Sequence, residues 1–241
     1  MRANENLILI GSKVILVPYK TDHVPQYHKW MKSPFLQEMT ASEPLTLEEE
    51  FEMQRTWHTD DDSIRSVPCF SHAIEQFAGS DVFLLIETDT ICSFPIRMHL
   101  HRAGATAKPR RRRAHKMIGD VNLFLNHPDD DRSFAEIEIM IAEEAYRRGG
   151  RGSEALKIMM GYALTRLDIA TFQAKISYTN MPSVDLFTRG LGFTQISESE
   201  VFQERTFEWS LKVPEEGEKV KEVRDEVLRG WGQVVQRRWD E

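Results

Sequence analysis

The segment between residues 134 and 167 restricts the fold of this chain more than any other part of the sequence. Apolar and acidic residues alternate over 134–141, the period-two pattern of a strand with one buried face. A glycine-rich turn at 147–152 follows, and apolar residues then recur on one face of a helix predicted over 153–167. A strand that leads through a tight turn into an amphipathic helix is typical of α/β layered domains.

Further strand and helix patterns flank this segment. Thr46 and Glu49 stand at capping-box spacing, which predicts a helix start there. The strands expected at 117–125 and 134–141 are interpreted as an antiparallel pair. The other expected elements are a hairpin at 7–17, a helix at 21–31, strands at 82–86 and 172–176, a helix start at 183–187 and strand-like sequence at 193–211. The pattern predicts an α/β layered fold.

The chain is expected to form one domain with a tail. The domain covers 1–212, and two segments without sustained periodicity, at about 60–81 and 90–116, are interpreted as insertions. The tail, 213–241, is charged and amphipathic, with apolar residues at helical spacing from Val220 to Val235. It is expected either to dock on the domain's own surface or to bind a partner.

Composition excludes several classes of protein. The 241 residues carry a net charge of −7, which does not attract nucleic acid or anionic membranes. Two cysteines, Cys69 and Cys92, are too few for a secreted disulfide scaffold, and no apolar run reaches the length of about 18 residues that a membrane helix needs. The histidines show no metal spacing, so no metal is expected. The low cysteine content and the lack of a long apolar run predict a cytoplasmic location. Arg110–Arg113 form a basic run without interleaved aromatics, which makes nucleic-acid binding an unfavoured alternative.

The glycine-rich turn predicts an anion site. Glycines let successive backbone N–H groups turn toward one point, and the positive end of the following helix lies there. Such a concavity binds phosphate or pyrophosphate, and arginines on the same loop pair well with phosphate oxygens. A tight connection without a ligand is the alternative. The residues concerned are Arg147, Arg148, Gly149, Gly150, Arg151, Gly152 and Ser153.

The order of motifs resembles the GNAT acetyltransferase superfamily. Arg147, Gly150 and Gly152 form Arg-x-x-Gly-x-Gly between a strand and a helix, as in its acyl-CoA pyrophosphate loop. The strand 174–176 and the residues Asn180, Ser183, Phe187 and Leu191-Gly192-Phe193 resemble its next block. The segments 5–17, 24–30, 40–47, 119–125 and 136–143 are similar to its eukaryotic N-acetyltransferase 9 group.

The resemblance implies a fold, a reaction and a donor. The fold is the GNAT acyl-CoA N-acyltransferase fold, a mixed central sheet flanked by helices. The reaction transfers acetyl from acetyl-CoA to an amine, expected to be a protein N-terminal or lysine amine. The strand end at Met140, Ile141 and Ala142 would hold the pantetheine arm and offer an oxyanion donor, while the loop 147–153, Asn180 and Phe187 would contact the cofactor.

Two departures keep a second hypothesis open. Superfamily members usually read Lys-Leu-Gly-Phe where this chain has one more residue, at Gly190, and many place a tyrosine near Phe187 as general acid. Phenylalanine cannot donate a proton. The alternative is therefore a non-catalytic GNAT scaffold that acts through the tail helix or the basic loop.

Three carboxylates are candidates for the acceptor side. Glu136 and Glu138 alternate with isoleucines and so project from one face of their strand, where either could take a proton from the amine. A solvated acidic face is the alternative. Glu43 is a rival acid or an anchor for the substrate amine.

Overall fold

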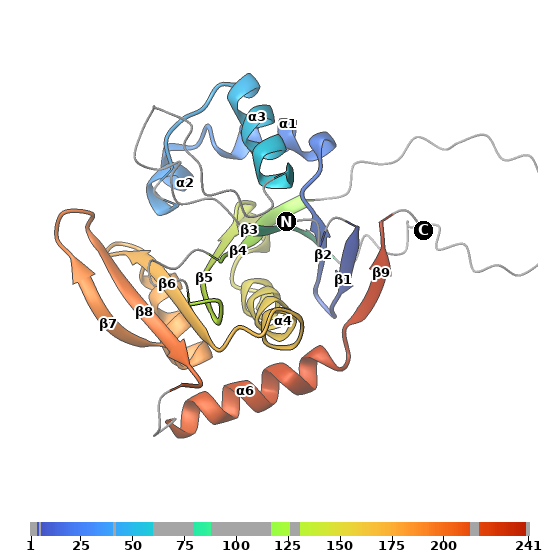
Figure 1. Cartoon of the computed structure of the whole chain (residues 1–241). Helices are drawn as coiled ribbons and strands as arrows, with labels where there is room; N and C mark the ends of the chain where they lie inside the picture. Colours follow the sequence, from blue (N-terminus) through green and yellow to red (C-terminus); the bar gives the residue numbers. More distant parts are fainter. Residues whose placement is uncertain are drawn as a thin grey trace, which may run out of the picture.

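A computed structural model describes residues 4, 6–40, 42–59, 80–87, 117–125, 131–212 and 217–239. The described strands form one mixed sheet, in the order β7-β8-β6-β5-β4-β3-β2-β1-β9 (Figure 1). They are β1 (Leu7–Ile10), β2 (Val14–Pro18), β3 (Ser80–Glu87), β4 (Met117–Phe124), β5 (Phe134–Ile141), β6 (Thr171–Ser177), β7 (Thr194–Ser199), β8 (Glu204–Ser210) and β9 (Val235–Arg238). Among these pairs only β5–β6 is parallel.

Helices cover both faces of the sheet (Figure 1). On one face lie η1 (Thr21–His23), α1 (Val24–Trp30), α2 (Pro34–Met39) and α3 (Leu47–Thr59). On the other lie α4 (Arg151–Arg166) and α6 (Glu218–Trp231). The remaining helical segments are η4 (Glu144–Tyr146), α5 (Met181–Asp185) and η5 (Leu186–Gly190). The expectation of a mixed sheet flanked by helices is confirmed.

Alternation along β4 and β5 divides the core in two. Val121 and Ile137 belong to the cluster packed on α4, whereas Met140 belongs to the cluster formed with Tyr27 and Trp30 of α1. Because successive strand residues point to opposite faces, the acids of β5 lie on the same face as α1. The predicted antiparallel pairing of these strands is confirmed, with Asn122 opposite Glu138.

The N-terminal expectations hold, with one element missed. The hairpin β1–β2 pairs Leu9 with Leu16. At the start of α3, Glu49 N–H donates to Thr46 Oγ1 at 3.3 Å and Thr46 N–H donates to the Glu49 carboxylate at 2.8 Å, which confirms the capping box. Helix α2, capped by Ser33, was not predicted.

The tail docks on the domain and then changes structure. Val223 and Val227 of α6 are buried in the cluster packed on α4, and Lys157 of α4 pairs with Glu226 at 2.6 Å. The prediction of helix as far as Val235 is wrong, because α6 ends at Trp231 and β9 pairs antiparallel with β1. Gly230 and Gly232 lower the helix propensity at the end of α6. The edge of β1 that does not pair with β2 is free to pair with β9.

The extra residue at Gly190 has a structural place. Residues Leu186–Gly190 form a π-helical turn, the form that a single inserted residue takes within a helix. Gly192 then ends the segment with φ at 74°, a left-handed conformation that favours glycine. The longer spacing thus leaves Leu191 and Phe193 buried in the main core.

Several predictions concern residues that the structure does not describe. Nearly all of the two proposed insertions, with Cys69, Cys92, His99, His101 and the basic run Arg110–Arg113, lies outside the described residues; only Ser80 and Asp81 enter β3. Within the described ranges, no helix combines the length and apolar character that crossing a membrane requires.

Candidate active site

The centre of the candidate site is a gap between β5 and β6. The two parallel strands pair only at Phe134–Thr171, Ala135–Phe172 and Glu136–Gln173. Beyond Glu136, β5 continues to pair with β4 on its other side as far as Ile141. Alternate backbone N–H and C=O groups between Ile137 and Ile141 therefore point toward β6 without a ladder partner there. An extended ligand can use these groups as it would those of a neighbouring strand.

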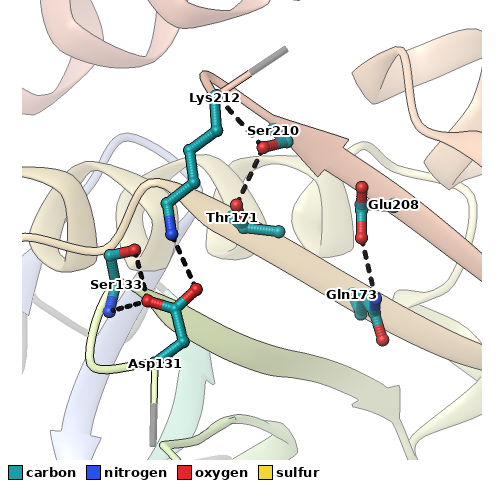
Figure 2. Close-up of polar contacts among 7 residues, drawn as sticks. All are labelled: Asp131, Ser133, Thr171, Gln173, Glu208, Ser210 and Lys212. Atoms are coloured by element: carbon teal, nitrogen blue, oxygen red, sulfur yellow. Dashed lines mark hydrogen bonds and ion pairs between the residues drawn. The ribbon is translucent and has the colours of Figure 1, made fainter. Parts of the chain in front are cut away.

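Polar contacts hold the closed end of this gap (Figure 2). Thr171 and Ser210 join β6 to β8 through their hydroxyls at 2.8 Å, and Gln173 Nε2 donates to Glu208 at 2.8 Å. Asp131, just before β5, accepts from Lys212 Nζ at 2.6 Å, and this bond with those from Ser133 lowers the pKa of Asp131 to about 2. These bonds fix β6 to β8 and the segment before β5 to the end of β8.

The glycine-rich loop follows the open end of β5. Arg148 and Gly150 have φ values of 61° and 78°, so the chain turns through two left-handed residues before α4 begins at Arg151. Gly150 stands at the N-cap and offers no side chain to the first N–H groups of the helix, which lack intrahelical partners. The loop therefore presents uncapped donors and the positive helix end, as the sequence predicted.

Lys13 lies close to the loop at Gly150. A Cβ on Gly150 would lie 2.7 Å from Lys13 Nζ, whereas one on Gly152 would make ordinary contacts at 3.7–3.8 Å with Ile141, Ile139 and Leu186. Lys13 reaches the loop from the β1–β2 turn, where its Nζ donates to Gly149 O at 3.2 Å. A cation beside uncapped N–H groups fits a phosphate or pyrophosphate group.

The β1–β2 turn is anchored to the first turn of α4. The Glu154 carboxylate accepts from the backbone N–H groups of Ser12, Lys13 and Val14 at 2.6–3.0 Å. This anchoring holds Lys13 over the loop. Sequence reasoning missed Lys13, because nothing near position 13 indicates contact with position 149.

Two arginines of the loop have protein partners. Arg147 Nε donates to Ile141 O at 2.8 Å and its Nη2 donates to Ala142 O at 3.1 Å, so its guanidinium braces the end of β5. Arg151 lies over the Tyr146 ring at 5.3 Å. Arg148, Gly149 and Ser153 complete the loop, with Arg148 and Gly149 exposed. Direct phosphate contacts by these arginines stay a prediction.

The face beside the gap, on the side of α1, is acidic. Glu136 pairs with Lys175 of β6 at 2.8 Å. Glu138 is half-buried, and burial together with the charges of Glu136 and Asp120 raises its pKa to about 8. Burial also raises the pKa of Asp120 to about 7, against a hydrogen bond from Asn122 that lowers it.

The other predicted residues have different surroundings. Asn180 caps α5 by accepting from Ser183 N–H at 3.3 Å, and a cofactor contact by this residue stays a prediction. Phe187 is buried and packs edge-on against Phe193 with ring centroids 5.0 Å apart, so its ring is part of the core. Glu43 is exposed in the loop between α2 and α3.

A groove of about 520 Å³ opens between the α1–α2 corner and the turn after β5. Trp30 Nε1 donates to Glu143 at 2.7 Å across it, and Arg147 stacks on the exposed ring of Phe35 at 5.2 Å. Sequence reasoning missed this groove because α2 was not predicted. Its lining residues are Lys29, Trp30, Ser33, Phe35, Leu36, Ala142, Glu143, Glu144 and Arg147.

Metal chemistry has no candidate in the described part of the chain. No group of three or more histidine, cysteine, aspartate or glutamate side chains in these ranges could hold an ion.

Comparisons with known proteins agree with this geometry. Residues 13–194 match the family model described as an acetyltransferase (GNAT) domain. The chain is 40% identical over 215 residues to the mouse alpha/beta-tubulin-N-acetyltransferase 9, covering 89% of this chain and 76% of that protein. It is 41% identical over 209 residues to the N-acetyltransferase 9-like protein of Nematostella vectensis, covering 87% and 88%.

Solved structures support the fold. The acetyl transferase of Salmonella typhimurium that modifies the N-terminal serine of ribosomal protein L7/L12 superposes with a TM-score of 0.57. The match covers 86% of this chain and 99% of that one at 15% identity, so it bears on the fold alone.

Proposed function

Because this chain belongs to the GNAT acetyltransferase family, we propose that it acetylates the α-amine of a protein acceptor and that Glu138 takes the proton from that amine. The protein is an N-acetyltransferase, and acetyl-CoA supplies the acetyl group as a thioester. The acceptor, the base and the residues that hold acetyl-CoA are the proposal.

The loop and strand end divide the binding of acetyl-CoA between them. The uncapped N–H groups at the start of α4 and Lys13 would hold the pyrophosphate, and the unpaired edge of β5 would hold the pantetheine arm. Arg147 would act indirectly, because its bonds to Ile141 O and Ala142 O fix the strand end. A backbone N–H of Met140, Ile141 or Ala142 would stabilise negative charge on the carbonyl oxygen.

The position and pKa of Glu138 carry the proposal. This side chain lies on β5, two residues beyond the last β5–β6 pair at Glu136, on the face opposite α4. A general base works best when its pKa lies near the operating pH, and burial raises the pKa of Glu138 to about 8. An α-amine, with a pKa of roughly 7.7–8.0, gives up its proton near this pH more readily than a lysine amine, with a pKa near 10.4.

Charge on this face favours a cationic acceptor. An α-ammonium group approaching the gap meets a surface of mainly negative charge, which raises its local concentration. The side chains concerned are Glu136, Glu204 and Glu208, with Lys175 as the cation among them.

Tubulin is the acceptor that the relatives suggest. The mouse and human proteins, each 40% identical to this chain, bear the name alpha/beta-tubulin-N-acetyltransferase 9. We therefore propose the N-termini of alpha- and beta-tubulin as acceptors, with the reaction in the cytoplasm.

The acceptor assignment is tested with matched peptides. Purified protein and acetyl-CoA are incubated with a tubulin N-terminal peptide and with the same peptide whose α-amine is blocked and whose internal lysine is free. We expect mass spectrometry to find the acetyl group on the first residue of the first peptide alone. Equal modification of the blocked peptide would overturn the assignment to α-amines.

A further inference from the structure

Two polar side chains on β4 are buried where an apolar pair would be expected. Asp120 is 3% exposed and Asn122 is 5% exposed, on the sheet face that α1 covers. Burial of an amide or a carboxyl group costs free energy unless hydrogen bonds compensate. Because burial of Asp120 and Asn122 is costly, we expect these two side chains to serve a function next to the acidic face.

The two side chains orient each other. Asn122 Nδ2 donates to Asp120 Oδ2 at 2.9 Å. An amide that donates to a carboxylate turns its carbonyl oxygen away from it. Asn122 Oδ1 has no hydrogen-bond partner among the described residues, and neither has Asp120 Oδ1. The pair thus keeps buried acceptors available for a donor.

The register brings that donor to the adjacent strand. Asn122 lies directly opposite Glu138 in the β4–β5 ladder, and Asp120 lies opposite Met140, diagonal to Glu138. Side chains of directly opposed residues have Cβ atoms about 4.5–5.5 Å apart. A carboxyl group that has taken up a proton becomes an O–H donor within reach of the Asn122 carbonyl oxygen.

Among the side chains that the structure describes, charged and titratable groups face this pair from several elements. Around Glu138 they are Glu136 on its own strand, Asp120 on β4, Lys175 on β6, Glu204 on β8 and Tyr27 on α1. Asp120 is also near Tyr19, which follows β2, and Glu50 of α3 acts on the same tyrosine. Lys175 is the one cation among these groups, so negative charge dominates and favours a protonated Glu138.

We infer that Asp120 and Asn122 are positioning residues for Glu138: Asn122 Oδ1 accepts from the protonated Glu138 carboxyl, and Asp120 holds the amide in that orientation. This inference rests on the proposed role of Glu138. In the step concerned, an N–H bond of the acceptor ammonium breaks, the electron pair stays on nitrogen, and the proton moves to a Glu138 oxygen. The hydrogen bond from that proton to Asn122 makes Glu138 a stronger base.

The test measures the Glu138 proton directly and then its effect on turnover. The full chain is labelled with ¹³C at glutamate carboxyl groups, and the Glu138 signal is identified by its absence in Glu138→Gln. NMR titration of wild type, Asn122→Ala and Asp120→Asn gives the pKa of Glu138 in each protein. The dependence of kcat on pH is measured on the same proteins with acetyl-CoA and the α-amine peptide.

Both variants are expected to lower the pKa of Glu138 by about 0.5–1 unit, the equivalent of one hydrogen bond or one nearby charge. The acidic limb of the kcat profile should move by the same interval, with KM for acetyl-CoA unchanged. Val227→Ala is the control, since it removes buried apolar atoms of α6 on the opposite face of the sheet and should lower Tm without moving the titration.

Two results have separate meanings. If Glu138 titrates at the same pH in wild type and in both variants, the positioning role is wrong even where activity falls. If Glu138→Gln retains the kcat of wild type, the proposed base is wrong, whatever the titration shows.

Discussion

Trp231 packs directly on Gly161, so closely that a Cβ on Gly161 would lie 2.8 Å from the Trp231 Cβ. Gly161 is in the middle of α4, and Trp231 ends α6. Glycine in a helix interior costs roughly 0.5–1 kcal/mol relative to alanine. The close approach of α6 accounts for its presence here.

Gly161→Leu should displace α6 from its packing position on α4. Inserted carbon atoms in a packed contact typically cost about 1–3 kcal/mol, which lowers Tm by roughly 2–4 °C per kcal/mol in a protein of this size. Thermal unfolding and limited proteolysis of the tail check this outcome. Gly230→Ala is the control, because nothing lies within 4 Å of the new Cβ. Equal stability of the two variants would contradict the contact.

Gly150→Trp should abolish acetyl-CoA binding while the protein stays folded. A side chain at φ 78° is strained, and its Cβ would press against Lys13 in the proposed pyrophosphate cradle. Isothermal calorimetry should show at least a tenfold weaker Kd, with circular dichroism unchanged. Gly190→Ala, where the new Cβ would lie 3.5 Å from Leu186, should bind as wild type does. Normal affinity in Gly150→Trp would remove the loop from the site.

Glu138→Gln should lower kcat by about 10²–10⁴-fold, the usual contribution of a general base, with little change in KM for acetyl-CoA. In wild type, kcat should rise with pH and level off above about 8, because Glu138 must be ionised to accept a proton. The variant should lose this dependence. Glu136→Gln is the matched comparison, since Glu136 is paired with Lys175, and it should have the smaller effect. A larger loss in Glu136→Gln would reverse the assignment.

Glu50→Gln should stabilise the protein at alkaline pH. Glu50 is 1% exposed, and burial raises its pKa to about 7. The unfolded chain ionises this group near pH 4.3, so the folded form binds the additional proton between that pH and about 7, and stability falls as pH rises through this window. At pH 8 the variant should have a Tm about 2–8 °C above wild type, and at pH 4 the difference should nearly vanish. A constant difference at both pH values would show that Glu50 does not titrate in this window.

Local patterns made most of the fold predictable. The capping box at Thr46 and Glu49 and the strand, turn and helix from 134 to 166 depend on residues a few positions apart, and both were predicted. Helix α2 was missed because six residues starting at Pro34 contain too little periodicity to detect. Strand β9 was missed because its partner, β1, lies at the other end of the chain.

The candidate site was predictable only in part. The glycine loop and the shared face of Glu136 and Glu138 follow from sequence, since one depends on conformation and the other on strand alternation. The partners of Arg147 and the approach of Lys13 depend on tertiary contacts and could not be predicted. The burial of Asp120 could not be predicted either. The strand that contains it has both polar and apolar residues, and the sequence does not show which face of the sheet a helix covers.

The pairing of β9 with β1 has a consequence for synthesis on the ribosome. Ile10 pairs with Val235, so nearly the whole chain separates the two strands. At synthesis rates of roughly 5–20 residues per second, the Leu-Ile-Leu-Ile edge of β1 waits for tens of seconds before its partner exists. An apolar strand edge of this kind can pair with another nascent chain. This edge of β1 therefore stays open in the nascent protein until β9 has been synthesised.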